Sequence, residues 1–342
     1  MVTAVMSPPP SPLHSSDEWN PEFSLSPMGR FSPTFAPDYS GSSTRFSTEG
    51  EFTLERRFCA SPPPHLVAKV KKLSENLGTP ASKIDRKPWI EPVKEFAPLA
   101  KTTLTLGYRQ YVDRPFSDVQ GPEFSHVKDP RIAGSYVVLD GRTYVLHQLP
   151  IVNQDQFSCE PTANEILEAI CKHSTPAWVN LSSSDDARGK QCEDCWTDYL
   201  QQEEIVDSQN NKQCLAVRNL SYKGHSFTQL HLDHWQDQQD NPDQALLFEL
   251  LERFHQLVVE NPEGVPFIHC AGGINRSRFF LCLYVVYRKL LENPDAPINV
   301  PEILMTSLIY RPHVHSRVLT WLEKYIPLLA QRVKNLNREF TL

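Results

Sequence analysis

Residues 265–291 read VPFIHCAGGINRSRFFLCLYVVYRKLL, and this stretch decides the fold. The apolar residues 265–269 predict a short buried strand, and residues 277–291 have the length and apolar content of a helix. The loop between them contains Gly272 and Gly273, which allow the backbone to curl tightly. The stretch therefore predicts a strand, a tight loop and a helix in direct succession.

The loop has the composition of an anion-binding site. Backbone N–H groups of a short glycine-containing loop can turn inward, and the following helix adds the partial positive charge of its N-terminus. This field favours the thiolate form of a cysteine at the loop's mouth, here Cys270. Arg276 can bind two phosphate oxygens with its planar guanidinium, and Ser277 can donate a hydrogen bond to the sulfur. The candidate phosphate-binding residues are Ala271, Gly272, Gly273, Ile274, Asn275 and Arg276.

The same residues have a second interpretation, a buried structural cysteine beside a helix that begins with arginine. The pattern Cys-x5-Arg alone arises often by chance. His269, Gly273 and Ser277 at their positions, with a strand before and a helix after, favour the catalytic interpretation. Cys270 is therefore the candidate nucleophile.

The composition excludes several classes of protein. A net charge of −7 and a pI near 6.0 argue against a nucleic-acid partner. The N-terminus lacks a basic and apolar signal, and the most apolar stretch, 279–287, is far below the roughly 20 residues that span a bilayer. The eight cysteines are spread through a long chain, which predicts reduced thiols. We expect a soluble, cytoplasmic monomer.

The first part of the chain differs from the rest. Residues 1–64 are rich in proline and serine and cannot bury enough apolar surface to fold, so they predict disorder. A partner-docking, phosphorylation or export segment is the functional alternative. Residues 65–104 predict a helical lead-in, and residues 105–342 the globular domain.

The globular part alternates strands and helices. Asp140-Gly141 within residues 136–149 predicts a hairpin of two strands. Further predicted elements are a helix over 165–172, a strand over 177–181 and helices over 243–260 and 318–333. This order predicts an α/β fold with a central twisted mixed β-sheet and helices on both of its faces.

Residues 269–277 resemble the signature His-Cys-x-x-Gly-x-x-Arg-Ser/Thr of the protein tyrosine phosphatase superfamily, the Cys-x5-Arg phosphatases. Residues 132–136, 144–150 and 190–196 are similar to segments of its tyrosine-specific branch. The resemblance covers residues 105–335, which favours the large tyrosine-specific-type domain. It implies a phosphatase domain over 105–342 that uses Cys270, Arg276, Ser277 and His269 and needs no metal or cofactor.

Trp235-Gln236-Asp237 resembles the mobile loop that supplies the general acid in this family. An acid is needed because the departing oxygen takes up a proton as the P–O bond breaks. Asp237 lies 33 residues before Cys270 (270 − 237), a spacing like that of the large tyrosine-specific branch. Trp235 would anchor the loop, and Gln236 replaces the usual proline. The alternative carboxylates nearby are Asp233, Asp240 and Asp243.

Other positions depart from the family. Phe116 stands at the position where the family has a tyrosine that stacks on the phosphotyrosine ring. A phenylalanine can stack but lacks the hydroxyl. No glutamine to orient the hydrolytic water follows residues 310–315, although His315 lies near that place. Asn275 stands where the tyrosine-specific branch has glycine, as in dual-specificity members.

The resemblance implies a phosphoprotein phosphatase that hydrolyses phosphotyrosine through a phosphocysteine intermediate, with phosphoserine and phosphothreonine as further substrates of a dual-specificity enzyme. An inositol-polyphosphate phosphatase and a catalytically weak phosphopeptide-binding pseudophosphatase remain the alternatives. The proline-rich tail is also similar to the tails of bacterial effectors that enter host cells by a non-classical route. Cys192 and Cys195 fit half a zinc site, a redox pair or, as we expect, two structural cysteines.

Overall fold

The computed structural model describes residues 62–106, 128–129, 134–149, 163–184, 198–208, 212–236, 241–312 and 314–339. All of them belong to one compact unit, residues 53–342. The predicted disorder of residues 1–64 therefore lies outside the described residues, apart from 62–64. Phe116, Asp237 and the pair Cys192 and Cys195 lie outside them as well.

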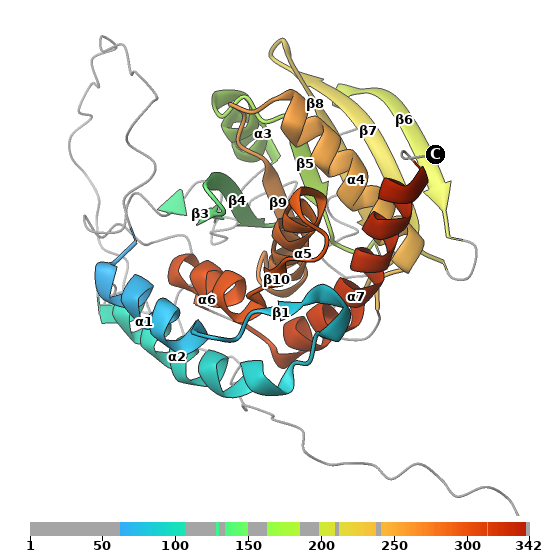
Figure 1. The fold of residues 1–342 in the computed structure, drawn as a ribbon. Coiled ribbons are helices and arrows are strands. Elements are labelled where there is room, and N and C mark those ends of the chain that lie inside the picture. Colours follow the sequence, from blue (N-terminus) through green and yellow to red (C-terminus); the bar gives the residue numbers. More distant parts are fainter. Residues whose placement is uncertain are drawn as a thin grey trace, which may run out of the picture. The chain divides into compact units, whose positions relative to one another are not determined.

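A mixed sheet forms the centre of the unit (Figure 1), with the strand order β2-β3-β4-β9-β5-β8-β7-β6 among the described residues. Strands β4, β9, β5 and β8 run parallel, and antiparallel strands flank them on both sides. The strands are β2 (Lys128–Asp129), β3 (Gly134–Leu139), β4 (Arg142–Gln148), β5 (Ala177–Asn180), β6 (Leu200–Asp207), β7 (Cys214–Tyr222), β8 (His225–Asp233) and β9 (Phe267–Cys270).

The hairpin predicted at Asp140-Gly141 is confirmed. It joins β3 to β4, and both turn residues have positive φ, 50° for Asp140 and 73° for Gly141. This backbone twist matches that of the flanking strands, which is why Asp-Gly marks such turns. A second hairpin, at Lys223-Gly224 between β7 and β8, has the same signature and φ values of 49° and 80°.

Helices cover both faces of the sheet, as predicted. One hydrophobic cluster packs α3 against Val145, Trp178 and Phe267. A larger cluster packs the remaining helices against the opposite face. The helices are α1 (Pro64–Ser74), α2 (Lys87–Leu106), α3 (Ala163–Lys172), α4 (Gln244–Glu260), α5 (Asn275–Glu292), α6 (Val300–Tyr310) and α7 (Ser316–Glu339). The α/β architecture with a central mixed sheet is thereby confirmed.

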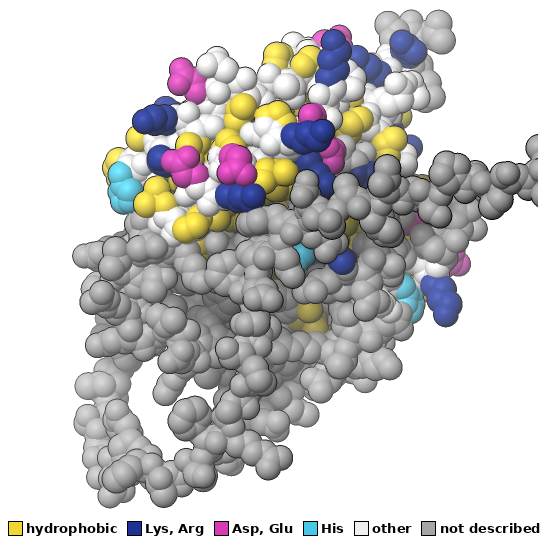
Figure 2. Space-filling model, turned by 90° about the horizontal axis from the view of Figure 1, so that it is seen from below, with side chains coloured by type: hydrophobic (Ala, Val, Ile, Leu, Met, Phe, Trp, Pro, Cys, Tyr) yellow, Lys and Arg dark blue, Asp and Glu magenta, His cyan; other side chains and the backbone are white. Residues whose placement is uncertain are grey.

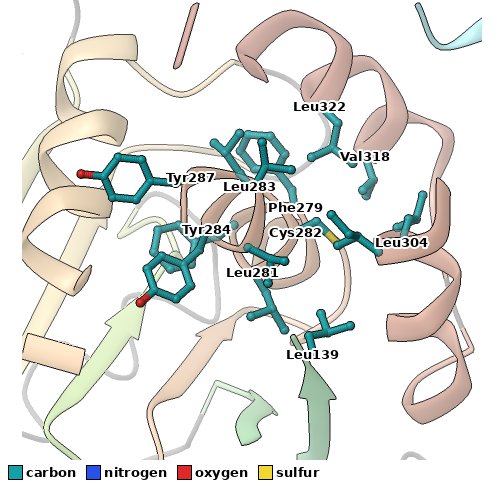
Figure 3. Close-up of a cluster of buried hydrophobic side chains, with 14 of the residues drawn as sticks. Leu139, Phe279, Leu281, Cys282, Leu283, Tyr284, Tyr287, Leu304, Val318 and Leu322 are labelled. Carbon is teal, nitrogen blue, oxygen red and sulfur yellow. The ribbon is translucent and has the colours of Figure 1, made fainter. Parts of the chain in front are cut away.

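Helix α5 is the centre of the larger cluster. Every residue from Arg276 to Tyr287 is buried, and a helix that is apolar on all sides is stable only when surrounded by other elements. In Figure 3 side chains radiate from α5 toward Leu139 of β3, Leu304 of α6 and Leu322 of α7. This burial fixes the position of the helix that begins directly after the glycine-containing loop.

The predicted helical lead-in folds as α1 and α2, which pack against α6 through Leu66, Trp89 and Phe96. Strand β1 (Thr79–Pro80) pairs with β10 (Pro297–Ile298), and the short 3-10 helix η1 (Ala81–Lys83) follows β1. On the face in Figure 2, basic, acidic and hydrophobic side chains are interspersed over the coloured part. None of the described helices is both long and apolar enough to cross a membrane.

Candidate active site

The sheet brings the candidate loops together at one edge. Because β4, β9, β5 and β8 are parallel, their carboxyl ends lie side by side. Cys270 ends β9, and Trp235 follows two residues after the end of β8. Ligands of open α/β sheets bind in the crevice beyond the carboxyl ends of the strands. The two segments that the sequence singles out therefore meet where such a site is expected.

The loop after β9 is fixed by backbone hydrogen bonds. The N–H of Gly273 donates to the Cys270 carbonyl at 3.2 Å, and the N–H of Leu149 donates to the Ala271 carbonyl at 3.3 Å. Cys270 is 2% exposed. The thiol is thus held at the floor of a tight turn that is joined to the end of β4.

This turn requires glycine at position 273. Its φ is +61°, in the left-handed region, and a Cβ atom there would lie 2.1 Å from the carbonyl oxygen of His147. Gly272 is different, because the nearest atom to a Cβ at its position is 3.8 Å away. The loop therefore requires one glycine for close approach to β4 and tolerates a side chain at the other.

Helix α5 begins directly after the loop. Its N-cap, Ile274, provides no side-chain cap, and the N–H of Arg278 makes the bond to the Ile274 carbonyl, at 3.3 Å. The N–H groups of Asn275, Arg276 and Ser277 precede that bond and belong to the first turn, whose N–H groups point toward the helix end. An anion is stabilised at this end by the N–H groups and by the helix dipole.

Arg276 and Ser277 are fully buried beneath the loop. An Nη of Arg276 donates to the main-chain carbonyl of Trp235, so the guanidinium spans the loop after β9 and the loop after β8. Among the described residues the Oγ of Ser277 has no hydrogen-bond partner. That hydroxyl is available to a group bound in the loop.

His269 lies in the core behind Cys270. Its ring centroid is 4.7 Å from that of His147 and 5.3 Å from that of Trp178, and its pKa is held well below the usual value by burial and by the neighbouring His147. His147 donates from Nδ1 to the Gln148 carbonyl and accepts from Trp178 Nε1. Both imidazoles are therefore neutral, and His269 supports the loop by packing.

The start of the loop after β8 is anchored in the core. The indole of Trp235 is fully buried and packs edge-to-face on Phe279, with centroids 5.8 Å apart, and on Trp321, with centroids 5.2 Å apart. His234 has a φ of +58°, and its N–H donates to Asp233 Oδ1. The structure thus places Trp235 in the core, between Phe279 of α5 and Trp321 of α7.

Two of the alternative carboxylates already have structural roles. Asp233 Oδ1 also accepts from the N–H of Ser184 at 2.7 Å. Burial raises the pKa of Asp233, but His231 and the N–H groups of Ser184 and His234 bring it below its usual value. Asp243 caps α4 by accepting from two N–H groups of its first turn. Both carboxylates therefore hold backbone in place.

The site geometry agrees with a comparison against known families. A family model for protein-tyrosine phosphatases matches residues 109–319, more than half of the chain. The chain belongs to the protein-tyrosine phosphatase family. No curated protein matches it. The predicted family is thereby confirmed, and the matched range contains the loop after β9 and extends to the start of α7.

Two buried side chains of the candidate site were not identified from the sequence as functional. Arg311 follows α6 and donates from Nη2 to the Gly272 carbonyl at 2.8 Å, and Arg278 donates to the main-chain carbonyl of Arg311. The Arg-Pro pair at 311–312 could have indicated Arg311 as a functional residue, whereas no local sequence pattern indicates Arg278. His315 accepts at Nδ1 from the N–H of Arg317 at 3.2 Å, next to the start of α7.

Proposed function

We propose that this protein hydrolyses phosphotyrosine in phosphoproteins, through a phosphocysteine intermediate on Cys270. The observation that carries the proposal is the loop itself. A buried cysteine ends a central parallel strand, and the buried Arg276 and the other residues of the first turn of α5 follow it. Fixed donors of this kind stabilise charge on the equatorial oxygens of a transferring phosphoryl group. The phosphatase domain of this proposal is residues 105–342.

The reaction proceeds in two steps. The thiolate of Cys270 attacks phosphorus, the bond from phosphorus to the tyrosine oxygen breaks, and Asp237 gives its proton to that oxygen. A water molecule then loses a proton to the Asp237 carboxylate and attacks the phosphocysteine, and the S–P bond breaks to release inorganic phosphate. Arg276 and the loop N–H groups bind the phosphoryl oxygens in both steps, with the Ser277 hydroxyl donating to the departing sulfur.

The assignment of the acid to Asp237 is supported by the neighbouring carboxylates. Asp233 is ionised and engaged with the N–H groups of Ser184 and His234, and Asp243 is engaged with the first turn of α4. A general acid needs a proton to give, which argues against Asp233. Asp237 follows directly after the segment that Trp235 and its contact with Arg276 hold at the site.

Phosphotyrosine is the preferred substrate because Ala271, Gly272, Ile274 and Asn275 bring no positive charge to the loop. A polyanionic inositol polyphosphate would be favoured by additional cations in contact with its other phosphates. Phosphoserine and phosphothreonine form part of the proposal as secondary substrates, on the basis of Asn275. In this proposal the protein is a cytoplasmic monomer, and the free thiols of Cys171, Cys214, Cys270 and Cys282 agree with a reducing compartment.

The decisive experiment is turnover of p-nitrophenyl phosphate by wild type and by Cys270→Ser across pH 5 to 7.5. Wild type should turn over, and the serine variant should not. Asp237→Asn should lower kcat by about 10²- to 10⁴-fold and remove the basic limb of the pH profile. Binding of phosphopeptides without any turnover by wild type would show a pseudophosphatase and refute the enzyme proposal.

Substrate class is tested with matched compounds. Peptides that carry phosphotyrosine, phosphoserine or phosphothreonine in one sequence context should rank in that order in kcat/KM, and inositol polyphosphates should fall below phosphotyrosine. Capture of phosphoproteins from lysate by Cys270→Ser then reports the physiological substrate. A higher kcat/KM for inositol polyphosphates than for the phosphotyrosine peptide would overturn the substrate assignment.

A further inference from the structure

A buried arginine outside the phosphate loop holds that loop from behind. Arg311 follows α6, and its guanidinium donates from Nη2 to the Gly272 carbonyl at 2.8 Å. Nη1 lies 3.3 Å from the Leu146 carbonyl and 3.4 Å from Ser135 Oγ. One side chain therefore joins the end of α6, strands β3 and β4, and the loop.

The bond to Gly272 completes the fixation of a single peptide unit. The carbonyl of the Gly272–Gly273 peptide accepts from Arg311, and the N–H of the same peptide donates to the Cys270 carbonyl at 3.2 Å. A peptide unit is planar, so fixing both of its polar groups fixes its orientation. The direction of the following N–H groups depends on this orientation, because Gly273 continues the chain with a φ of +61°.

Arg278 in turn holds Arg311. It lies on α5 two residues after Arg276, and its guanidinium donates to the main-chain carbonyl of Arg311. Both side chains are almost completely buried. Burial lowers the pKa of Arg278 to about 9 and that of Arg311 to about 10, so both remain protonated at neutral pH.

We propose that Arg311 and Arg278 are positioning residues for phosphate binding: Arg311 orients the Gly272–Gly273 peptide, and Arg278 holds Arg311 in place. The inference rests on the proposed function, because it concerns the same loop. The orienting role requires the planar shape of the guanidinium, which a single ammonium group does not reproduce.

The orienting role is tested by titrating inorganic phosphate into the folded full-length chain. Arg311→Met should weaken phosphate binding by about ten- to hundredfold, since small displacements of binding groups cost this much. Arg311→Lys should remain close to the methionine variant, because one ammonium cannot reproduce the forked contacts to Gly272 and Leu146. Arg278→Met, which removes a single contact to Arg311, should weaken binding by roughly three- to tenfold.

Arg142→Met is the matched control. Arg142 is also partly buried and donates to three main-chain carbonyls, of Val258, Asn261 and Gly264, at 3.0–3.1 Å. These contacts lie at the opposite end of α4 from its Asp243 cap. The control should therefore lose stability like the other variants, as measured by urea unfolding, without a change in phosphate affinity.

Phosphate affinities equal to that of wild type in folded Arg311→Met and Arg278→Met would overturn the inference. If Arg311→Met fails to fold, Arg278→Met carries the test, because it leaves the Arg311 guanidinium itself intact. Recovery of phosphate binding in Arg311→Lys would also overturn the orienting role. Failure of the proposed function is distinguishable, because wild type itself would then show neither phosphate binding nor turnover.

Discussion

Replacement of Gly273 by alanine tests two structural requirements of the phosphate loop, a left-handed backbone and a close approach to β4. Its φ of +61° is left-handed, which costs a residue with a Cβ about 1–2 kcal/mol. The new Cβ would also lie 2.1 Å from the His147 carbonyl oxygen and 2.5 Å from its carbon. These atoms belong to the backbone of β4 and cannot rotate away, so overpacking adds roughly 1–3 kcal/mol. We therefore expect Gly273→Ala to lower the free energy of unfolding by about 2–5 kcal/mol.

Three other glycines provide matched controls. Gly141 and Gly224 also have positive φ, 73° and 80°, but a Cβ at either position meets no atom within 4 Å. Alanine there should cost about 1–2 kcal/mol, the backbone contribution alone. Gly272 lies in the loop with its nearest contact at 3.8 Å, so Gly272→Ala should be nearly neutral.

The assay is urea unfolding monitored by tryptophan fluorescence, together with titration of inorganic phosphate. Gly273→Ala should also lose phosphate binding, because relief of the contact with His147 moves the loop, whereas Gly141→Ala should bind as wild type does. A destabilisation of Gly273→Ala no larger than that of Gly141→Ala would refute the steric argument. Unchanged phosphate affinity in Gly273→Ala would refute the assignment of the loop.

Three further changes have expected outcomes that unfolding and activity measurements can check. Trp235→Ala should cost about 3–5 kcal/mol in urea unfolding, because it empties a fully buried site between Phe279 and Trp321; a cost below 1 kcal/mol would contradict this packing. Burial lowers the pKa of His147 to about 3, so the unfolded chain binds its proton first, and stability should fall as the pH drops from about 6.5 toward 3, with a smaller slope in His147→Phe. Arg332→Ala should cost less than about 1 kcal/mol and leave turnover unchanged, because its ion pair with Glu252 is partly exposed; a cost above 2 kcal/mol would be inconsistent with a screened surface pair.

The parts of the fold that the sequence predicts are those with strong local signals. Asp140-Gly141 has the turn residues that a hairpin needs, and Asp243, where the predicted helix over 243–260 starts, is the N-cap of α4. Helix α6 was not predicted. Its apolar residues lack helical spacing because nearly the whole helix is buried, although Asn299 caps it and Pro301 lies in its first turn.

Strand β6 was also missed, for the opposite reason. Leu200–Asp207 is exposed at almost every position, so apolar and polar residues do not alternate along it. It forms a strand because it pairs with β7 at the edge of the sheet, in a register that local sequence does not specify. Its ion pair between Glu204 and Arg253 of α4 links residues that are far apart in the sequence.

The candidate site also combines features that local sequence predicts with features that depend on long-range packing. Cys270, Gly273 and Arg276 are close in sequence, so a strand, a loop and a helix N-terminus suffice to predict their arrangement. The contact from Arg311 to Gly272 spans 39 residues, and that from Arg278 to Arg311 spans 33. Such contacts depend on how α6 packs against α5 and the sheet, and no local pattern encodes that packing.

The phosphocysteine mechanism is tested most directly by identifying the residue that becomes phosphorylated during turnover. A phosphotyrosine peptide labelled with radioactive phosphate is mixed with the protein, the reaction is quenched within one turnover, and the labelled residue is mapped by mass spectrometry. The phosphocysteine mechanism predicts phosphate on Cys270, more of it in Asp237→Asn because the second step slows, and none in Cys270→Ser. Turnover with no labelled cysteine, or turnover that persists in Cys270→Ser, would contradict it.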